Sequence, residues 1–539
     1  MSLTLLAAPT FASRPTVNEV RTLLRSPRGS LSLGRTNGGS ITNSIEIPLS
    51  GYGYAFFPMI RTRKSHFSTS EMAKLIPRVA RIVRRQFRGS ILGIGNVSVE
   101  GGGPIGQSVS HRSGRDVDFG MYAKDRRGRR INLKSFVRFG RDGWDRQHRY
   151  QFDTDRNLAL VVALLEDTKV QVQWIFVADW LKQKLLAEAW EQGVDPIIIS
   201  RMDTVLHQPG DSNPHQDHYH VRIYCSVDDR RHGCIERGPI WDWVDLGDTA
   251  YQEYVDQLID ASRVDSVAWQ KRVVEHLGRI RATRAAPRLL SLISDALPPV
   301  QHAALKALRA MREPELFTSF IRRLSTLSDE SHATRLLRIA LQLEHPEAND
   351  VARMMLRNDG SILMTGQRPT PGMIRAGLQR LGLHGTAMDA AHMRPFLRSA
   401  NKKTSKVAAR AFERLTGTAS PGRVSEAERA VFWEEFLSKH PAVSRAQWFV
   451  AALRAAGVRI RLVPDWQDIP SLIAALRQRN ALLAHTASRL LTHITGHPVD
   501  PRARTLRNTQ RAWRTFWRNL QAFTSAEPAE RSIRRPLER

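Results

Sequence analysis

The amino-acid sequence predicts two dissimilar parts, an α+β N-terminal domain with a small antiparallel sheet and an all-α, solenoid-like domain of helical repeats. Length is one reason, because 539 residues exceed the roughly 250–300 at which a single hydrophobic core stops growing. Periodicity is another: helical and alternating patterns are mixed up to about residue 247, and strand patterns nearly vanish beyond it. We therefore expect domains over 41–247 and 248–524, a leader and linker over 1–40, and a flexible tail over 525–539.

The α+β part is predicted element by element from hydrophobic spacing and turn residues. A capping-box pattern from Ser68 to Glu71 predicts a helix that runs through residue 87. A glycine-rich turn at 101–104 follows the first predicted strand. The remaining pattern predicts strands over 91–99, 116–121, 170–177 and 218–225 and helices over 156–166 and 179–190.

In the second part, apolar residues recur three and four positions apart, which is typical of amphipathic helices. Pro287 and Pro298 stand at predicted helix starts, where proline is tolerated. The pattern predicts successive helices over 267–282, 285–294 and 298–311.

This helical part also contains an internal echo. The segment 408–417 recurs 79 positions later as 487–496. Each copy precedes a stretch with a tryptophan and a phenylalanine, namely Trp433 with Phe436 and Trp513 with Phe516. The pattern resembles HEAT or armadillo-type repeats, which implies an interaction platform for a protein partner that the sequence does not identify.

A net charge of +29 predicts attraction to anionic partners. The basic residues are spread along the whole chain without a recognised nucleic-acid module, so nucleic acid is not favoured, and a genome that favours arginine is an alternative explanation. The longest strongly apolar run, 158–165, is shorter than the ~20 residues of a membrane helix, so no transmembrane segment is expected.

Two features bear on the compartment. The first 13 residues have an apolar stretch but no Lys or Arg before Arg14, as in a weak or truncated secretory leader, and a chance start codon would look the same. Cys225 and Cys234 are the only cysteines, and a disulfide between them would close a small loop. We favour that disulfide and an oxidising compartment over two buried thiols.

Two short segments about a hundred residues apart carry candidate metal ligands. His111 precedes Asp118 by seven positions, with Gly114 permitting a turn between them. The second segment holds three imidazoles within six residues, those of His215, His218 and His220. A catalytic zinc takes three protein ligands and keeps one position open, which these residue types could supply.

Spacing leaves the ligand set undecided. Asp116 and Asp118 lie on the same face of the predicted strand, since side chains alternate with a period of two. His218 and His220 share a face for the same reason. The residues by themselves therefore predict metal-assisted amide hydrolysis without assigning each role.

Together with the turn at 101–104 and the cysteine pair, these residues resemble the penicillin-insensitive murein endopeptidases over about residues 45–240. That family is a branch of the lysostaphin, D-Ala-D-Ala and hedgehog-type zinc metallopeptidases. The resemblance implies a zinc ion held by His111, Asp118 and His220, with His218 as catalytic base and His215 as a second polar helper. Ser108 is a departure, because related enzymes often have another histidine there.

The resemblance also implies the reaction. We expect a periplasmic or secreted enzyme that hydrolyses D-alanyl-meso-diaminopimelyl crosslinks of peptidoglycan with a metal-activated water. Two alternatives stay open: a cell-wall-binding scaffold whose helical repeats recruit a partner, and a D,D-carboxypeptidase on the same zinc site. The positive charge is consistent with an anionic polymer as substrate.

Overall fold

The computed structural model describes residues 14–496 except positions 27, 107, 210–213, 237, 358, 360–367, 423, 442–443 and 478–479, together with residues 509, 510, 513, 514 and 517. Phe516, the predicted leader up to residue 13 and the predicted tail over 525–539 lie outside the described residues. The chain divides into two compact units. The first comprises Met1–Pro209, Pro214–Arg288 and Leu297–Ala310, and the second comprises Gly210–Asn213, Leu289–Ala296 and Met311–Arg539.

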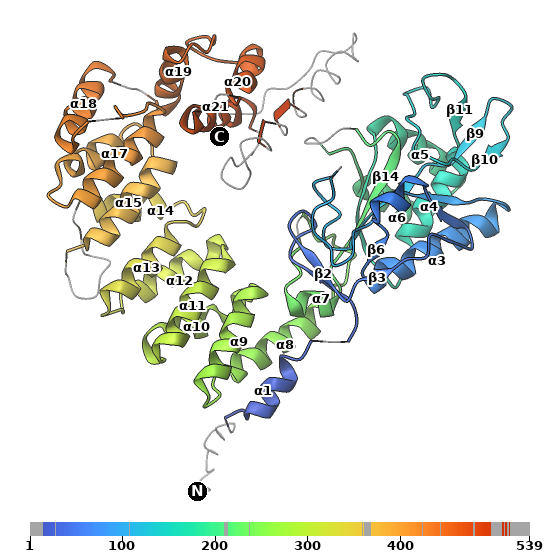
Figure 1. The fold of residues 1–539 in the computed structure, drawn as a ribbon, viewed down its shortest axis with the longest axis horizontal. Coiled ribbons are helices and arrows are strands. Elements are labelled where there is room, and N and C mark those ends of the chain that lie inside the picture. The colour runs from blue at the N-terminus through green and yellow to red at the C-terminus, as the bar shows by residue number, and fades with distance from the viewer. Residues whose placement is uncertain are drawn as a thin grey trace, which may run out of the picture. The chain divides into compact units, whose positions relative to one another are not determined.

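A seven-stranded sheet organises the first unit, with strand order β13-β12-β14-β8-β7-β5-β4. Figure 1 labels its strand β14. Its strands are β4 (Ser50–Gly51), β5 (Tyr54–Phe56), β7 (Leu92–Ile94), β8 (Asp116–Gly120), β12 (Val172–Phe176), β13 (Leu206–His207) and β14 (His218–Ile223). The β5–β7 and β12–β13 pairs are parallel and the other neighbours are antiparallel. The prediction of a small antiparallel sheet is therefore wrong.

Helical crossovers explain the parallel pairs, because parallel neighbours cannot be joined by a tight hairpin. The chain between β5 and β7 forms α2 (Met59–Arg63) and α3 (Ser70–Gln86). The chain between β12 and β13 forms α5 (Asp179–Glu191) and α6 (Pro196–Val205), of which α6 was not predicted. Smaller sheets pair β1 (Leu31–Leu33) with β2 (Ser40–Thr42), β3 (Ile45–Glu46) with β6 (Phe67–Ser68), and β9 (Ala123–Asp125) with β10 (Arg130–Ile131) and β11 (Tyr150–Phe152).

The large sheet has one apolar and one polar face at β8 and β14. Val117 and Phe119 of β8 and Tyr219 and Val221 of β14 are fully buried in one core, which they share with α3, α5, α6 and α4 (Thr154–Leu165). Because side chains alternate along a strand, the residues between them face the other way. That opposite face carries the predicted site.

The helix predicted after Ser68 is present, but the predicted capping box is not. The helix α3 begins at Ser70 with Thr69 as its N-cap, and no side chain caps it. Ser68 instead ends β6, where it pairs with Ile45. The strand predicted over 91–99 shortens to the three residues of β7, whereas the strands predicted from 116, 170 and 218 are confirmed as β8, β12 and β14.

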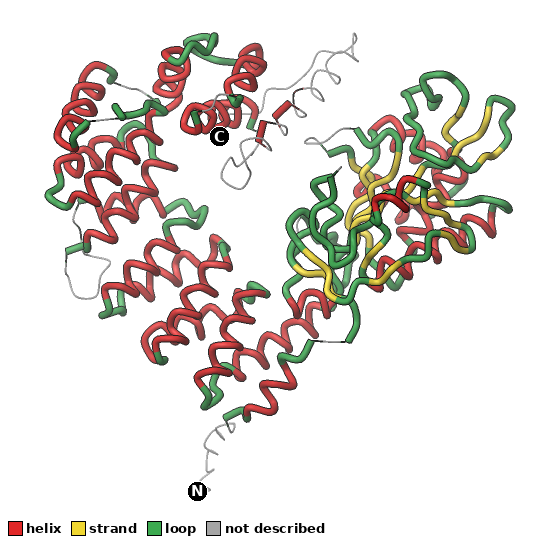
Figure 2. The backbone as a smooth tube through the Cα atoms, viewed as in Figure 1, coloured by secondary structure: helices red, strands yellow, loops and turns green. Residues whose placement is uncertain are grey.

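From α8 onward the described residues form helices without strands (Figure 2). The helix predicted over 298–311 is confirmed as α11, and none of the described helices combines the length and hydrophobicity needed to cross a membrane. The helices are α8 (Asp248–Ala261), α9 (Val267–Arg279), α10 (Ala286–Asp295), α11 (Pro298–Met311), α12 (Phe317–Leu324), α13 (Glu330–Ala340), α14 (Ala348–Leu356), α15 (Pro371–His384), α16 (Asp389–Met393), α17 (Lys402–Thr416), α18 (Glu426–Lys439), α19 (Arg445–Ala455), α20 (Ile469–Ala475) and α21 (Ala481–Thr495).

The internal echo corresponds to α17 and α21. Their N-caps, Asn401 and Asn480, each accept two backbone N–H groups, which satisfies donors that a helix start leaves free. Both helices end at a left-handed glycine, Gly417 and Gly496. The repeated segment thus ends at the same C-terminal glycine in both helices, and the likeness of the two helices extends beyond the segment to their asparagine N-caps.

The predicted disulfide joins Cys225 and Cys234. Between them lies α7 (Val227–His232), which starts with a capping box at Ser226 and ends at the left-handed Gly233. The bond thus closes a short capped helix directly after β14.

Candidate metal centre

Two neighbouring strands bring most of the predicted site together. β8 and β14 are antiparallel, with His220 opposite Asp118 and Arg222 opposite Asp116. Directly opposed residues project on the same face of a sheet. The register therefore gathers both aspartates and His220 on the polar face.

His111 joins them from a loop whose contacts fix its ring. Its backbone has φ of 62°, which is uncommon for a residue with a side chain, and its N–H donates to Asp116 Oδ2 at 3.1 Å. The ring Nδ1 lies 2.9 Å from the carbonyl oxygen of Val97, so Nδ1 carries the proton and donates it. The other ring nitrogen, Nε2, is left to face Asp118 Oδ1 at 3.0 Å.

Asp118 is the point on which the imidazoles converge. Its Oδ1 lies 3.2 Å from His220 Nδ1 and 3.5 Å from His218 Nε2. Its other oxygen, Oδ2, accepts a hydrogen bond from Asn96 Nδ2 at 3.1 Å, which fixes the carboxylate plane. Burial alone would raise the pKa of Asp118, but the neighbouring His111 and His218 hold it well below its usual value. The carboxylate stays ionised at neutral pH.

Asp116 has a different set of partners. Its Oδ1 accepts from Arg222 Nε at 2.7 Å and lies 3.2 Å from His220 Nε2. Burial would raise its pKa, but the Arg222 guanidinium, together with His220 and His111, holds it well below the usual value. A proton on His220 Nε2 satisfies this contact and leaves Nδ1 unprotonated toward Asp118. Asp116 therefore orients a neighbouring imidazole.

His111, Asp118 and His220 form one buried group that could hold a metal ion, with one ligand atom from each lying within 4.8 Å of the others. His215, His218 and His220 form a second such group. Asp116 is a member of neither.

His215 and His218 lie beside this buried group. His218 Nδ1 is 2.7 Å from Asp217 Oδ1, so Asp217 holds the proton on Nδ1 and turns Nε2 toward the cluster. The rings of His215 and His218 are 5.1 Å apart. Burial, followed by the nearby His218 and His220, lowers the pKa of His215 well below its usual value, so its imidazole is neutral.

Several contributors to the cluster were not predicted. Asp217 could have been found from its position directly before His218 in a histidine-rich segment. Asn96 and the Val97 carbonyl carry no such signal, because they act from a loop after β7. Ser108 lies outside both groups, and its hydroxyl is 3.0 Å from that of Ser110.

Gly114 closes the loop between His111 and β8. Its φ is +74°, and a Cβ added there would lie 2.7 Å from Ile41 Cδ1 and 2.8 Å from the backbone nitrogen of Thr69. The turn predicted at Gly114 is confirmed, and it requires both a left-handed backbone and the absence of a side chain.

We expect Gly114→Ala to lower the free energy of unfolding by more than the left-handed backbone alone accounts for. Gly128→Ala is a matched control, because Gly128 has the same φ of +74° but open space where a Cβ would lie. The control should cost about 1–2 kcal/mol, and Gly114→Ala about 1–3 kcal/mol more through overpacking. Chemical denaturation measures both, and equal losses would contradict the packing argument.

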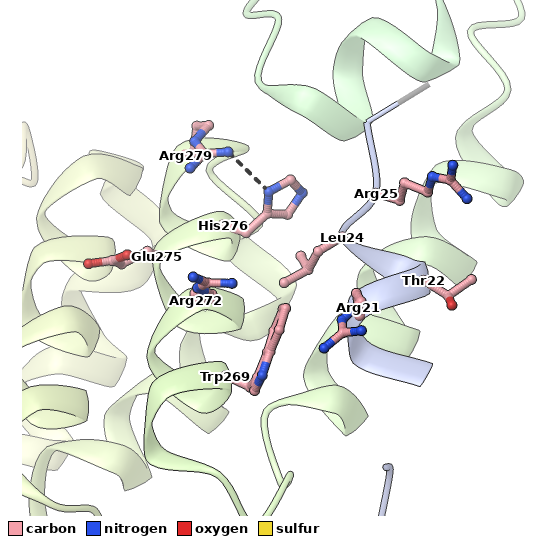
Figure 3. A pocket seen from close by; sticks show the side chains of 9 residues that line it. All are labelled: Arg21, Thr22, Leu24, Arg25, Trp269, Arg272, Glu275, His276 and Arg279. Atoms are coloured by element: carbon pink, nitrogen blue, oxygen red, sulfur yellow. Dashed lines mark hydrogen bonds between the residues drawn. The ribbon is translucent and has the colours of Figure 1, made fainter. Parts of the chain in front are cut away.

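A cavity of about 590 Å³ lies elsewhere in the first unit and contains none of the predicted site residues. Its walls come from α9 and from α1 (Val17–Leu23) with the residues that follow it. Figure 3 shows Trp269 beside Arg21 and Arg272, whose guanidinium carbons are 5.6 and 4.5 Å from the ring centroid. The lining of this cavity is rich in arginine, and none of its residues takes part in the candidate metal centre.

Comparison with known proteins adds independent information. No curated protein matches the chain. An engineered protein of known structure matches at 14% identity and a TM-score of 0.23, covering 68% of this chain and 89% of its own. Human deoxyhypusine hydroxylase in complex with glycerol matches at 17% identity and a TM-score of 0.17, covering 63% and 98%. At these TM-scores neither structure informs the fold or the site.

A family model described as penicillin-insensitive murein endopeptidase matches residues 32–266. The matched segment contains His111, Asp118, His215, His218 and His220, and it also contains the disulfide. The family expected from the motif is thus the one that matches. The segment 32–266 is thus similar to the penicillin-insensitive murein endopeptidases, and the match indicates a peptidase.

Proposed function

We propose that this protein is a zinc-dependent endopeptidase that hydrolyses D-alanyl-meso-diaminopimelyl crosslinks of peptidoglycan. The observation that carries the proposal is the buried convergence of His111, Asp118 and His220 within the segment that matches the family. Two imidazoles and a carboxylate are a donor set that suits zinc at a catalytic site, where three protein ligands leave one position open.

The surroundings of the three residues support a metal. His111 donates its Nδ1 proton to Val97, and His220 directs Nε2 to Asp116. Such outer hydrogen bonds are typical of metal-binding histidines, because they fix the tautomer and the ring orientation. In addition, His215 Nδ1 is buried without a hydrogen-bond partner in the described part of the chain, which suits a site completed by a ligand.

His111, Asp118 and His220 would hold the zinc ion, which would supply Lewis acidity toward a carbonyl and lower the pKa of water toward ~7. His218 performs the proton transfers: its Nε2 accepts a proton from the attacking water and returns it to the leaving amine. Asp217 keeps the other nitrogen protonated, so Nε2 is always the atom that exchanges. His215, neutral and adjacent, assists as a polar group beside the reacting carbonyl.

The remaining assignments rest on the same proposal. A peptidoglycan substrate fits a periplasmic or secreted enzyme, the disulfide suits an oxidising compartment, and the charge of +29 would help to retain an anionic polymer. We assign the catalytic domain to 41–247 and a HEAT-like solenoid to 248–524. The shared caps of α17 and α21 support a repeat architecture.

Metal analysis combined with digestion of purified sacculi tests the proposal on the full chain. We expect one zinc ion per chain and the conversion of crosslinked muropeptides to monomers, identified by mass spectrometry. A chain that binds no zinc, or that cuts nothing when loaded with it, would refute the enzyme assignment. Release of terminal D-alanine with intact crosslinks would instead indicate a D,D-carboxypeptidase, and zinc and wall binding without turnover a scaffold.

A further inference from the structure

A row of aromatic rings leads away from the candidate metal centre, beginning on the same face of the sheet and ending with two tryptophans that pack against the core. Phe176 of β12 lies opposite His220 of β14, and Trp174 lies opposite Arg222, so these side chains share the polar face. The Phe176 ring is 5.5 Å from the His220 ring and 5.8 Å from the His215 ring. The row therefore begins in contact with the imidazoles.

Three tryptophans continue the row. The Trp174 ring stacks on Phe176 at 5.7 Å, Trp241 meets Trp174 edge-on at 4.9 Å, and Trp243 stacks on Trp241 at 5.8 Å. We call these four residues, Phe176, Trp174, Trp241 and Trp243, the aromatic row. All four are only partly buried, although large aromatic side chains gain most from full burial.

The row is held in place and has charged neighbours. Trp241 Nε1 donates to the carbonyl oxygen of Gln173 at 2.8 Å, which fixes the central indole. The Arg222 guanidinium lies 5.5 Å from the Phe176 ring, and that of Arg201 lies 5.5 Å from the Trp243 ring. A preorganised set of partly exposed rings with hydrogen-bond donors at both ends is suited to binding a ligand.

The chemistry of the proposed substrate selects the ligand class. Stem peptides of peptidoglycan consist of alanine, an acidic residue and diaminopimelate, none of which offers a large apolar side chain to an indole. The pyranose rings of the glycan strand do offer an apolar face, lined by C–H groups, with hydroxyl and acetamido groups at the rim. Aromatic faces pack against such C–H surfaces, and guanidinium groups donate to the polar rim.

We propose that the aromatic row binds sugar rings of the glycan strand that bears the scissile crosslink. The inference rests on the proposed function, since it extends the same site from the reacting amide to the polymer that carries it. It makes the enzyme selective for crosslinks still attached to glycan over free crosslinked peptides.

Binding of a soluble β-1,4-linked N-acetylglucosamine tetramer to the full chain, followed by calorimetry, tests the row without any hydrolysis. We expect saturable binding that Trp243→Ala weakens about tenfold, as for loss of one aromatic contact, and that Trp243→Phe largely preserves. Trp190→Ala is the control, because Trp190 lies on α5 with 63% of its surface exposed and outside the row. It should bind the tetramer like the wild type.

Hydrolysis supplies the second measurement. Crosslinked muropeptides with their disaccharides are compared with the same crosslinked peptides after the sugars are removed. The wild type should prefer the sugar-bearing substrate, and Trp243→Ala should reduce this preference about tenfold through KM rather than kcat.

The two measurements separate the two proposals. Tetramer binding that depends on Trp243 supports the row even if neither substrate is cut, an outcome that removes only the proposed hydrolysis. Absence of tetramer binding, or equal binding by the wild type and Trp243→Ala, overturns the inference whatever the chain hydrolyses. A wild type that cuts both substrates equally well overturns it too.

Discussion

Replacement of His218 by alanine is expected to lower kcat on crosslinked muropeptides by about 10²–10⁴-fold, the usual contribution of a positioned general acid–base group. His218 Nε2 faces the cluster, and Asp217 holds the proton on Nδ1, so the variant removes the only proton-transfer group that we assign. Zinc should stay bound, because the proposed ligands remain in place. Steady-state kinetics and metal content measured on the same preparation test both statements.

The control for this experiment is His302→Ala, which removes an exposed imidazole on α11 of the first unit. It should leave both kcat and zinc content unchanged. If His218→Ala loses zinc together with activity, His218 is a ligand and its assignment as base is wrong. If it keeps full activity, proton transfer belongs to another group.

Replacement of Asp118 by asparagine is expected to abolish both zinc binding and hydrolysis. Asp118 Oδ1 is the atom on which His111, His218 and His220 converge, and its low pKa keeps the carboxylate ionised. The amide supplies no negative charge, so the loss in zinc affinity should exceed the 10–100-fold typical of outer-shell partners. Competition with a chelator measures the affinity.

Asp116→Asn is the matched comparison, since it changes the same chemical group two residues away on the same strand face. Asp116 contacts Arg222 and His220 rather than the point of convergence. We expect the variant to keep zinc with an affinity reduced by about 10–100-fold. A larger loss in Asp116→Asn than in Asp118→Asn would exchange the proposed roles of the two aspartates.

The alternating pattern in the sequence was enough to bring the candidate residues together. The period of two at 116–118 and 218–220 predicts which side chains share a face, and the register of β8 with β14 confirms it. Spacing could not decide which of Asp116 and Asp118 is the metal ligand, because both side chains project from the same face of the strand. The proposed choice of Asp118 is supported by Arg222, which reaches Asp116 from across the strand pair.

The features that the sequence did not predict are mostly contacts between distant residues and strands of two or three residues. β5 and β13 have three and two residues, too few for a periodic pattern, and their parallel partners are set by helices between them. The left-handed backbone of His111 has no sequence signal either, since it goes with hydrogen bonds that His111 donates to Val97 and Asp116. Local patterns do not encode such contacts.

The disulfide that follows β14 bears on how reliably the site assembles. A slip of one residue between β14 and β8 would turn His218 and His220 into the apolar core and bring Tyr219 and Val221 to the polar face. Cys225, two residues beyond the end of β14, is covalently anchored to Cys234, and Gly34 pairs with Cys234 from a distant part of the chain. The disulfide thus disfavours a shift in the register of β14 against β8, which keeps His218 and His220 on the polar face.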